Sequence, residues 1–139
     1  HDQTRRQRQM CIRDRAKCAV FRTEKTLKEG VDQIRKPYEG ISDISVKDKS
    51  LLFNTDLVET LEFDNLISQA LTTMDSAYNR RESRGAHARE DFTKRDDKNF
   101  MKHTLAWQKG KKVEIKYRDV HSRTLTNDVQ YFPPKERVY

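Results

Sequence analysis

The chain has 139 residues, which is enough for one domain with a modest hydrophobic core. Charged residues make up 37% of it and hydrophobic residues only 34%, so it is too polar for a large globular enzyme. This balance suits a small helical domain, or a piece that completes its core against another protein surface. There is no run of 18 apolar residues and no apolar signal-peptide segment, so we expect neither a membrane span nor a secretory leader.

The formal net charge of +7 makes nucleic acid the first partner to consider. Residues 1–15 contribute +3 of this charge, because they hold five arginines against two aspartates. In the rest of the chain the two signs are well mixed. This mixing is typical of an ordinary solvated surface, and we expect no nucleic-acid partner.

The first fifteen residues, HDQTRRQRQMCIRDR, show neither helical nor alternating periodicity. One interpretation is a disordered basic tail. The stretch RQRQMCIRDR also resembles translated sequencing-adapter read-through, which would make residues 1–15 non-native, and we set them apart from the fold. Neither Cys11 nor Cys18 has a second Cys or a His at zinc-ligand spacing. A reducing, intracellular location is expected.

A first amphipathic helix is predicted over residues 24–40, where apolar side chains recur at steps of four and three. The stripe consists of Leu27, Val31, Ile34, Tyr38 and Ile41. Thr23 is the expected N-cap and Gly40 fits the end. Pro37 lacks an N–H group, which predicts a kink or an early stop.

A second, longer helix is predicted to run from a capping box of Asp56 and Glu59 to about Glu82, with Thr55 as the rival cap. Its apolar positions again step by four and three, namely Phe63, Ile67, Ala70, Met74 and Ala77. A helix about 40 Å long is too long to stand alone. The apolar residues 16–21 could be the last turns of a truncated first helix, which predicts a three-helix bundle.

After this helix the period is lost, and the charged stretch REDFTKRDDKNF is expected to be irregular. Residues 113–117 alternate between apolar and charged side chains, as in a strand with one solvated face. Residues 103–107 are the expected partner strand, and residues 108–111 the turn. The predicted fold is therefore mainly α, with a helical part in residues 16–92 and a small β-hairpin and tail in residues 93–139.

Three aromatic residues, Trp107, Tyr117 and Phe132, are expected to pack the hairpin and the tail onto the bundle. Pro133 and Pro134 give the tail an extended path. No pair of the four histidines has helical metal-ligand spacing, and the four glycines form no phosphate-binding loop. No carboxylate has a setting that indicates burial. We therefore predict no catalytic, cofactor-binding or metal-binding residue.

The segment NRRESRGAHAREDF, residues 79–92, allows three interpretations. It could be a helix C-terminus, where cations meet the negative end of the dipole and Gly85 takes a left-handed conformation. It could bind nucleic acid, but its arginines lack interleaved aromatic residues and Glu90 and Asp91 follow directly. It could also be an interface corner, since arginines bind carboxylates and glycine permits close approach.

Several stretches resemble one family in the same order along the chain. They are AVFRT (19–23), LKEGVDQI (27–34), FNTDLVETLEFDNL (53–66), RRESRGAHAREDF (80–92), RDDKNFMKHTLAW (95–107), VEIKYRDV (113–120) and FPPKERVY (132–139). Together they resemble the C-terminal domain of the flavoprotein subunit of succinate dehydrogenase. Fumarate reductase and L-aspartate oxidase have similar stretches, but PPKERVY and HAREDF look more like succinate dehydrogenase. Pro37 departs from the helical residue usual in the family.

The resemblance implies a spectrin-like three-helix bundle, with its first helix truncated, and a small β appendage with an extended tail. It implies a parent enzyme that oxidises succinate to fumarate on a covalently held FAD. Electrons would pass to an iron–sulfur subunit and, through membrane anchor subunits, to quinone. The family's flavin-linking and substrate-binding residues lie upstream, so this chain is expected to be inactive alone. The enzyme would lie peripherally on the bacterial inner membrane or on the mitochondrial matrix side.

The resemblance also implies a role for the interface corner. Arg84, Gly85 and His87 are expected to close the long helix and to dock the bundle on upstream FAD-binding and capping domains, with Arg89 as a further candidate. Arg84 would make charge-assisted hydrogen bonds across that contact, and Gly85 would permit the close approach. The alternative from another functional class is a free-standing basic helical module that binds RNA or a protein.

Overall fold

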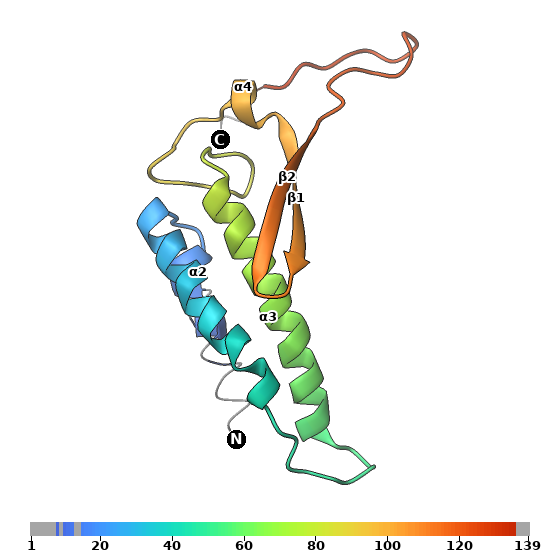
Figure 1. The fold of residues 1–139 in the computed structure, drawn as a ribbon. Helices are drawn as coiled ribbons and strands as arrows, with labels where there is room; N and C mark the ends of the chain where they lie inside the picture. Colours follow the sequence, from blue (N-terminus) through green and yellow to red (C-terminus); the bar gives the residue numbers. More distant parts are fainter. Residues whose placement is uncertain (1–7, 9, 13–14, 136–139) are drawn as a thin grey trace.

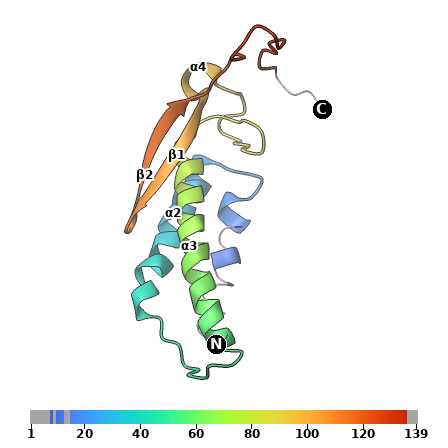
Figure 2. The same cartoon turned by 90° about the vertical axis from the view of Figure 1, so that its right-hand side faces the viewer.

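The computed structural model describes residues 8, 10–12 and 15–135. Its elements are α2 (Glu24–Glu39), the 3-10 turn η1 (Ile41–Asp43), α3 (Thr55–Asn79), α4 (Asp97–Phe100), β1 (Lys102–Lys109) and β2 (Lys112–Asp119). Helices α2 and α3 lie side by side and run antiparallel, and the hairpin lies along α3 (Figures 1 and 2). A helical domain with a small antiparallel hairpin is thus confirmed. Within the described ranges, no helix is long and apolar enough to span a membrane.

Helix α2 begins where the sequence predicts. The Thr23 hydroxyl accepts a hydrogen bond from the Thr26 N–H at 3.2 Å, and the Thr26 hydroxyl accepts one from the Thr23 N–H at 2.9 Å. The predicted early stop at Pro37 is wrong, because the helix continues to Glu39. Pro37 lies in the last turn, where its missing N–H removes a single bond near the end of the helix. Gly40 follows as the C-cap, as expected.

Helix α3 begins on a different residue from the one predicted. The side chain of Asn54 accepts from the Leu57 N–H at 2.9 Å and is the N-cap. The predicted capping box of Asp56 and Glu59 is therefore wrong. The Asp56 carboxylate instead accepts from the backbone N–H groups of residues 47 and 48, at 2.6 and 3.1 Å. It fixes the loop before α3 to the first turn of the helix.

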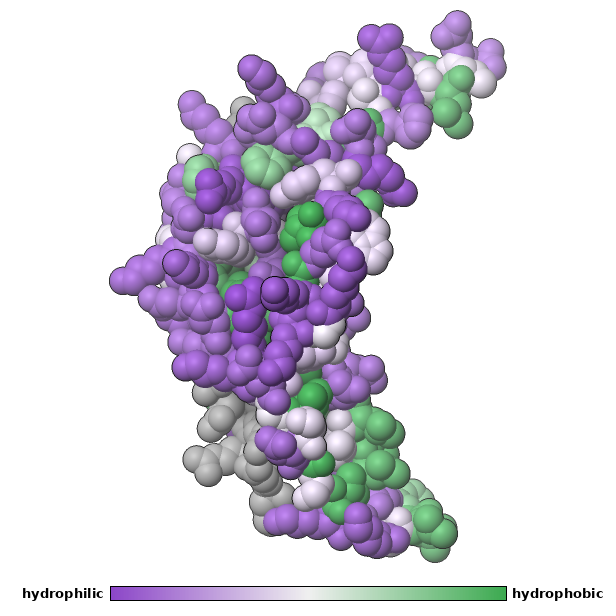
Figure 3. Space-filling view, in the orientation of Figure 1, coloured by the Kyte–Doolittle hydropathy of each residue, from purple (hydrophilic) through white to green (hydrophobic). Residues whose placement is uncertain are grey.

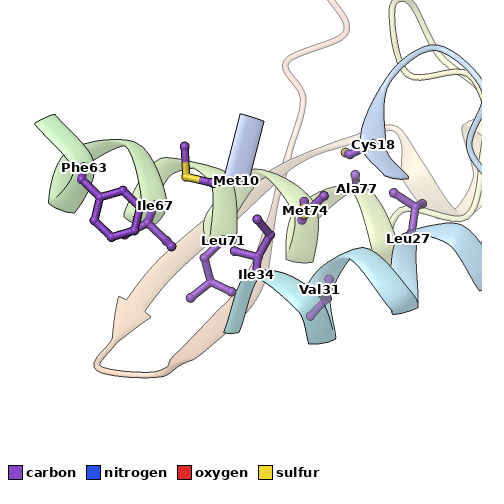
Figure 4. Close-up of a cluster of buried hydrophobic side chains, with 10 residues drawn as sticks. All are labelled: Met10, Cys18, Leu27, Val31, Ile34, Phe63, Ile67, Leu71, Met74 and Ala77. Carbon is purple, nitrogen blue, oxygen red and sulfur yellow. The ribbon is translucent and has the colours of Figure 1, made fainter. Parts of the chain in front are cut away.

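The core lies between α2, α3 and the helical residues near the N-terminus (Figure 4). Its buried hydrophobic residues are Met10, Cys18, Leu27, Val31, Ile34, Phe63, Ile67, Leu71, Met74 and Ala77. All the predicted α3 positions are among them except Ala70, which packs against the core while half-buried. Met10 belongs to residues 1–15, of which residues 1–7, 9 and 13–14 lie outside the described ranges.

A glycine allows the N-terminal helical residues to approach α2 closely. A Cβ atom added to Gly30 would lie 2.9 Å from the Lys17 Cβ and 3.0 Å from the Met74 Cε, and only the methionine end could move aside easily. The Lys17 ammonium also donates to the Glu29 carboxylate of α2 at 2.7 Å. The apolar residues 16–21 are helical only through Cys18.

The predicted hairpin is present, but its strands are longer and its turn shorter than predicted, because Gln108 and Lys109 belong to β1. Strands β1 and β2 pair antiparallel from Lys102 opposite Asp119 to Lys109 opposite Lys112. Gly110 occupies the turn with a φ of +57°, a left-handed conformation that favours glycine.

The contact of the hairpin with the helices differs from the expectation. Val113 of β2 packs against the core. Trp107 and Tyr117 are 46% and 41% exposed, and Tyr117 packs edge-on against Phe100 rather than on the helical core. Phe132 is 75% exposed, so the predicted packing of the tail by this residue is wrong.

Candidate functional site

The interface corner begins where α3 ends. The helix stops at Asn79, three residues before the predicted end, and Arg80 is extended with a φ of −88° and a ψ of 103°. In an extended segment, alternate side chains point to the same side. Arg80, Glu82 and Arg84 therefore meet although they are separated by single residues in the sequence.

Glu82 is the centre of this group and is completely buried. Its Oε1 accepts hydrogen bonds from the Nε atoms of Arg80 and Arg84, at 2.8 and 2.9 Å. Its Oε2 accepts from Arg84 Nη2 and from the Asp96 backbone N–H, both at 3.0 Å. This carboxylate corrects the expectation that no acidic residue of the chain is buried.

The hydrogen bonds keep this buried group ionised. Burial acts to raise the pKa of Glu82, but the donors of Arg84, the Asp96 N–H and Arg80 outweigh burial, and the pKa is lowered. The same hydrogen bond from Arg84 to Glu82 raises the pKa of the Arg84 guanidinium. Arg84 also pairs with Asp97 at 2.5 Å. Both ions are thus held in their charged forms by partners within the chain.

Arg80 connects this cluster to the hairpin. Its Nη1 donates to the Lys102 carbonyl at 3.0 Å and to the Thr104 hydroxyl at 2.9 Å. Its Nη2 donates to the Phe100 carbonyl at 2.6 Å, and the guanidinium lies 5.7 Å from the centre of the Phe100 ring. One side chain therefore joins the end of α3 to α4 and to the start of β1.

The chain then makes a tight turn over Arg84, Gly85, Ala86 and His87. The Arg84 N–H donates to the His87 carbonyl at 2.8 Å, and the His87 N–H donates to the Arg84 carbonyl at 3.0 Å. Gly85 has a φ of +58°, which favours glycine at the first central position. Gly85 and Ala86 are exposed, and no atom lies within 4 Å of a Cβ placed on Gly85. The turn is the projecting tip of the corner.

His87 is held behind this tip as a neutral ring. Its Nδ1 lies 2.8 Å from Arg22 Nη1, which can only donate, and its Nε2 lies 3.0 Å from the Arg80 carbonyl, which can only accept. The proton must therefore sit on Nε2. Burial lowers the pKa of His87, and the nearby charges of Arg22, Arg89 and Arg80 lower it further against the opposing hydrogen bond to the Arg80 carbonyl.

Arg89 is 2% exposed and binds Asp91 with two parallel hydrogen bonds, of 2.8 Å from Nε and 2.6 Å from Nη2. Its Nη1 donates to the carbonyl of Tyr78 at 3.1 Å, in the last turn of α3. Asp91 also accepts from the Glu24 N–H at 2.7 Å, at the start of α2. The pair thus joins the end of one helix to the beginning of the other.

The Arg89–Asp91 pair should make folding depend on pH at the acid end. The hydrogen bond from Arg89 lowers the pKa of Asp91 from 3.8 to about 2. Because the folded pKa is the lower one, this stabilisation is present above about pH 4 and is lost as the pH falls towards 2. We expect the difference in Tm between the wild-type chain and Asp91→Asn to shrink over that interval. A difference in Tm that stayed constant from pH 5 to pH 2 would contradict this assignment.

All four predicted corner residues lie together in this segment. The sequence reasoning missed four others, which are Arg22, Arg80, Glu82 and Asp91. The alternation of arginine, glutamate and arginine at steps of two, directly after a helix, was the available signal for the Glu82 cluster. Asp91 follows Arg89 at the same step of two. Arg22 becomes visible only in three dimensions, because residue 22 pairs with residue 89 as a short β-bridge.

Two open pockets flank the corner. One of about 310 Å³ lies between Val20, Phe21 and Arg89, and one of about 420 Å³ lies beside Arg80 and Phe100. The part of the chain that the structure describes contains no cluster of three or more His, Cys, Asp or Glu side chains suited to a metal ion. The arginines and acids of the corner bind one another, so the arrangement is suited to holding the shape of a surface.

Comparisons with known proteins identify the family. The family described as fumarate reductase flavoprotein C-term matches residues 7–139. The chain is 54% identical to the mitochondrial succinate dehydrogenase flavoprotein subunit of Oryza sativa over 121 residues, and 51% identical to that of Rickettsia bellii over 122. Each match covers 87% of this chain but only 19–20% of the relative.

A solved structure agrees with this match. The structure of an E. coli quinol fumarate reductase variant superposes with a TM-score of 0.87 at 32% identity, covering 100% of this chain and 23% of that one. The chain thus spans about a fifth of the length of the relatives that it matches. This chain belongs to the fumarate reductase and succinate dehydrogenase flavoprotein family and corresponds to its C-terminal domain.

Proposed function

We propose that the chain acts as the C-terminal domain of the FAD-containing subunit of succinate dehydrogenase, the oxidoreductase that converts succinate to fumarate. The observation that carries the proposal is the identity of 50–54% to succinate dehydrogenase flavoprotein subunits over 87% of the chain. The fumarate reductase flavoprotein of Haemophilus influenzae is 42% identical over 65% of the chain. Other succinate dehydrogenase subunits are 40–41% identical but match over 85–87% of the chain, so the longer match favours succinate dehydrogenase over fumarate reductase.

The partners and the location follow from that assignment. The subunit would pass electrons to an iron–sulfur subunit and, through membrane anchor subunits, to quinone. It would lie peripherally on the cytoplasmic face of a bacterial inner membrane or on the matrix side of a mitochondrial one. Each of these statements rests on the similarity to succinate dehydrogenase subunits.

The described residues do not fit FAD as a binding site of their own. A dinucleotide needs backbone N–H groups that approach its phosphates closely, usually from a glycine-rich loop. Gly30 is packed in a helix, Gly85 turns the corner and Gly110 turns the hairpin. The flavin would therefore be held by other parts of the flavoprotein, and no chemical step is assigned to residues of this chain.

We further propose a spectrin-like three-helix bundle, in which residues 10–12 and 15–18 belong to the end of its first helix. The burial of Met10 and Cys18 in the core supports this packing. The close approach of Lys17 to Gly30 supports it as well.

The corner is proposed to dock this domain on the FAD-binding and capping domains through its exposed tip. The guanidinium groups of Arg84 and Arg89 bind carboxylates within the chain. They would therefore hold the tip in place rather than bind the FAD-binding or capping domain directly. His87 supports the turn from behind. The open space around Gly85 would allow another backbone to approach closely.

Gly110 provides a matched control for this proposal, because it also has a positive φ and open space around its Cβ position. In the full-length enzyme, Gly85→Glu should reduce the rate of succinate oxidation by about tenfold or more, because misplaced domains disturb the reacting geometry. Gly110→Glu carries the same backbone strain and should retain the rate. Circular dichroism should show unchanged helicity in both. Equal rates in the two variants would contradict the docking role of the tip.

A further inference from the structure

The end of the molecule opposite the corner carries a cluster of exposed apolar side chains, which we call the apolar end. It consists of Leu51, Leu52 and Phe53 in the loop before α3, and of Leu57, Val58 and Leu61 in the first turns of α3. The three loop residues are 100%, 81% and 98% exposed. Figure 3 shows hydrophobic side chains gathered at the lower end of the molecule, with hydrophilic ones beside them. Clusters of this kind usually mark a contact surface.

The loop at the apolar end is held in a defined shape. The Asn54 amide donates to the carbonyls of Asp48 and Ser50, at 2.9 and 3.0 Å. Phe53 has a φ of +48°, which is uncommon for a residue with a bulky side chain, and its carbonyl accepts from the Thr55 N–H at 2.9 Å. The chain thus fixes three apolar side chains in positions that expose them to water. This arrangement is costly unless another surface covers them.

The helix continues this surface as a face with little charge. Starting at Leu57, the positions on one side include Leu61, Asn65, Ser68 and Thr72, with Asp64 beside them seven residues after Leu57. The other positions named are uncharged, in a chain of which 37% is charged, and α3 contains no lysine or arginine. Depletion of charge is typical of the centre of permanent interfaces, whereas transient contacts are more polar. The apolar end therefore fits a partner that is always present.

We propose that the apolar end is buried against the remaining polypeptide of the same flavoprotein, as a second, mainly apolar contact in addition to the tip of the corner. This inference rests on the proposed function. The chain covers 19–23% of the length of the relatives given above, so the domain belongs to chains four to five times as long. A contact within one polypeptide is permanent, which matches a surface with apolar side chains and little charge.

The test is the rate of thiol labelling in the flavoprotein that carries this domain. Leu52→Cys and Leu61→Cys are placed in a Cys11→Ser background, and N-ethylmaleimide uptake on the peptides that carry them is followed by mass spectrometry. Lys112→Cys, at the exposed turn end of β2, is the control. Each rate is compared with that of the same variant unfolded in urea. We expect both leucine positions to react at least about tenfold more slowly in the folded flavoprotein, and Lys112→Cys to react within about twofold of its unfolded rate.

Labelling of Leu52→Cys and Leu61→Cys at the unfolded rate would overturn the inference. Protection that increases with protein concentration would also overturn it, in favour of a second copy of the flavoprotein. Protection that requires the iron–sulfur subunit would assign the surface to that subunit instead. Succinate oxidation is measured on the same samples. An active enzyme with a freely labelled apolar end would refute this contact while leaving the proposed function intact.

Discussion

Replacement of Glu82 by alanine is expected to lower the free energy of unfolding of the chain by about 3 kcal/mol. The substitution removes a fully buried carboxylate and leaves the guanidinium groups of Arg80 and Arg84 close together without their shared counterion. Removal of one partner from a buried ion pair costs about 3–5 kcal/mol. The lower end applies here, because the side chains of Arg80 and Arg84 remain 15% and 25% exposed.

The measurement is urea denaturation followed by circular dichroism. Glu82→Gln keeps the shape of the side chain and one acceptor oxygen, so it should lie between the wild type and Glu82→Ala. Glu90→Ala removes an exposed carboxylate eight residues along the same segment and should change the free energy by about 0.5 kcal/mol or less. If Glu82→Ala lowered the free energy of unfolding by no more than about 1 kcal/mol, which is the cost of an ordinary substitution, the cluster would not stabilise the corner.

The elements that could be predicted from the sequence are those fixed by local patterns. The apolar side chains of α2 recur at a spacing that places them on one side only in a helix, and the N-cap Thr23 lies directly before them. The hairpin is likewise specified by alternation in two neighbouring strands and by Gly110 between them. Pro37 misled the prediction because its effect depends on its position in the helix. In the last turn it removes little.

The corner could be predicted only in part, because its structure depends on residues far apart in the sequence. The run of arginines marked the segment, but burial of Glu82 requires the backbone of Asp96 and the fold of α4 behind it. Asn54 was missed as the cap of α3 for a related reason. Asp56 has the stronger local pattern, but the preceding loop folds back and uses its carboxylate. Where a side chain could bind either of two backbone groups, tertiary structure determines which one it binds.

Replacement of Phe63 by alanine should have the largest effect in the helical core, with a loss of about 3–5 kcal/mol in the free energy of unfolding. Phe63 is fully buried, at one end of the core beside Ile67 (Figure 4). Alanine would remove the whole ring and leave a cavity, because α2 and α3 cannot collapse onto it without moving the rest of their contact. The same urea titration measures this change.

Phe53→Ala is the matched control, because it makes the same chemical change ten residues away at a side chain that is 98% exposed. In the isolated chain it should alter the free energy of unfolding by about 0.5 kcal/mol or less, since no packing is lost. In the full flavoprotein Phe53 belongs to the surface that we expect to be covered, so the same substitution should then become destabilising. Equal losses for Phe63→Ala and Phe53→Ala in the isolated chain would mean that Phe63 is not packed between the helices. The difference between the two losses thus measures the packing of the Phe63 ring in the isolated chain.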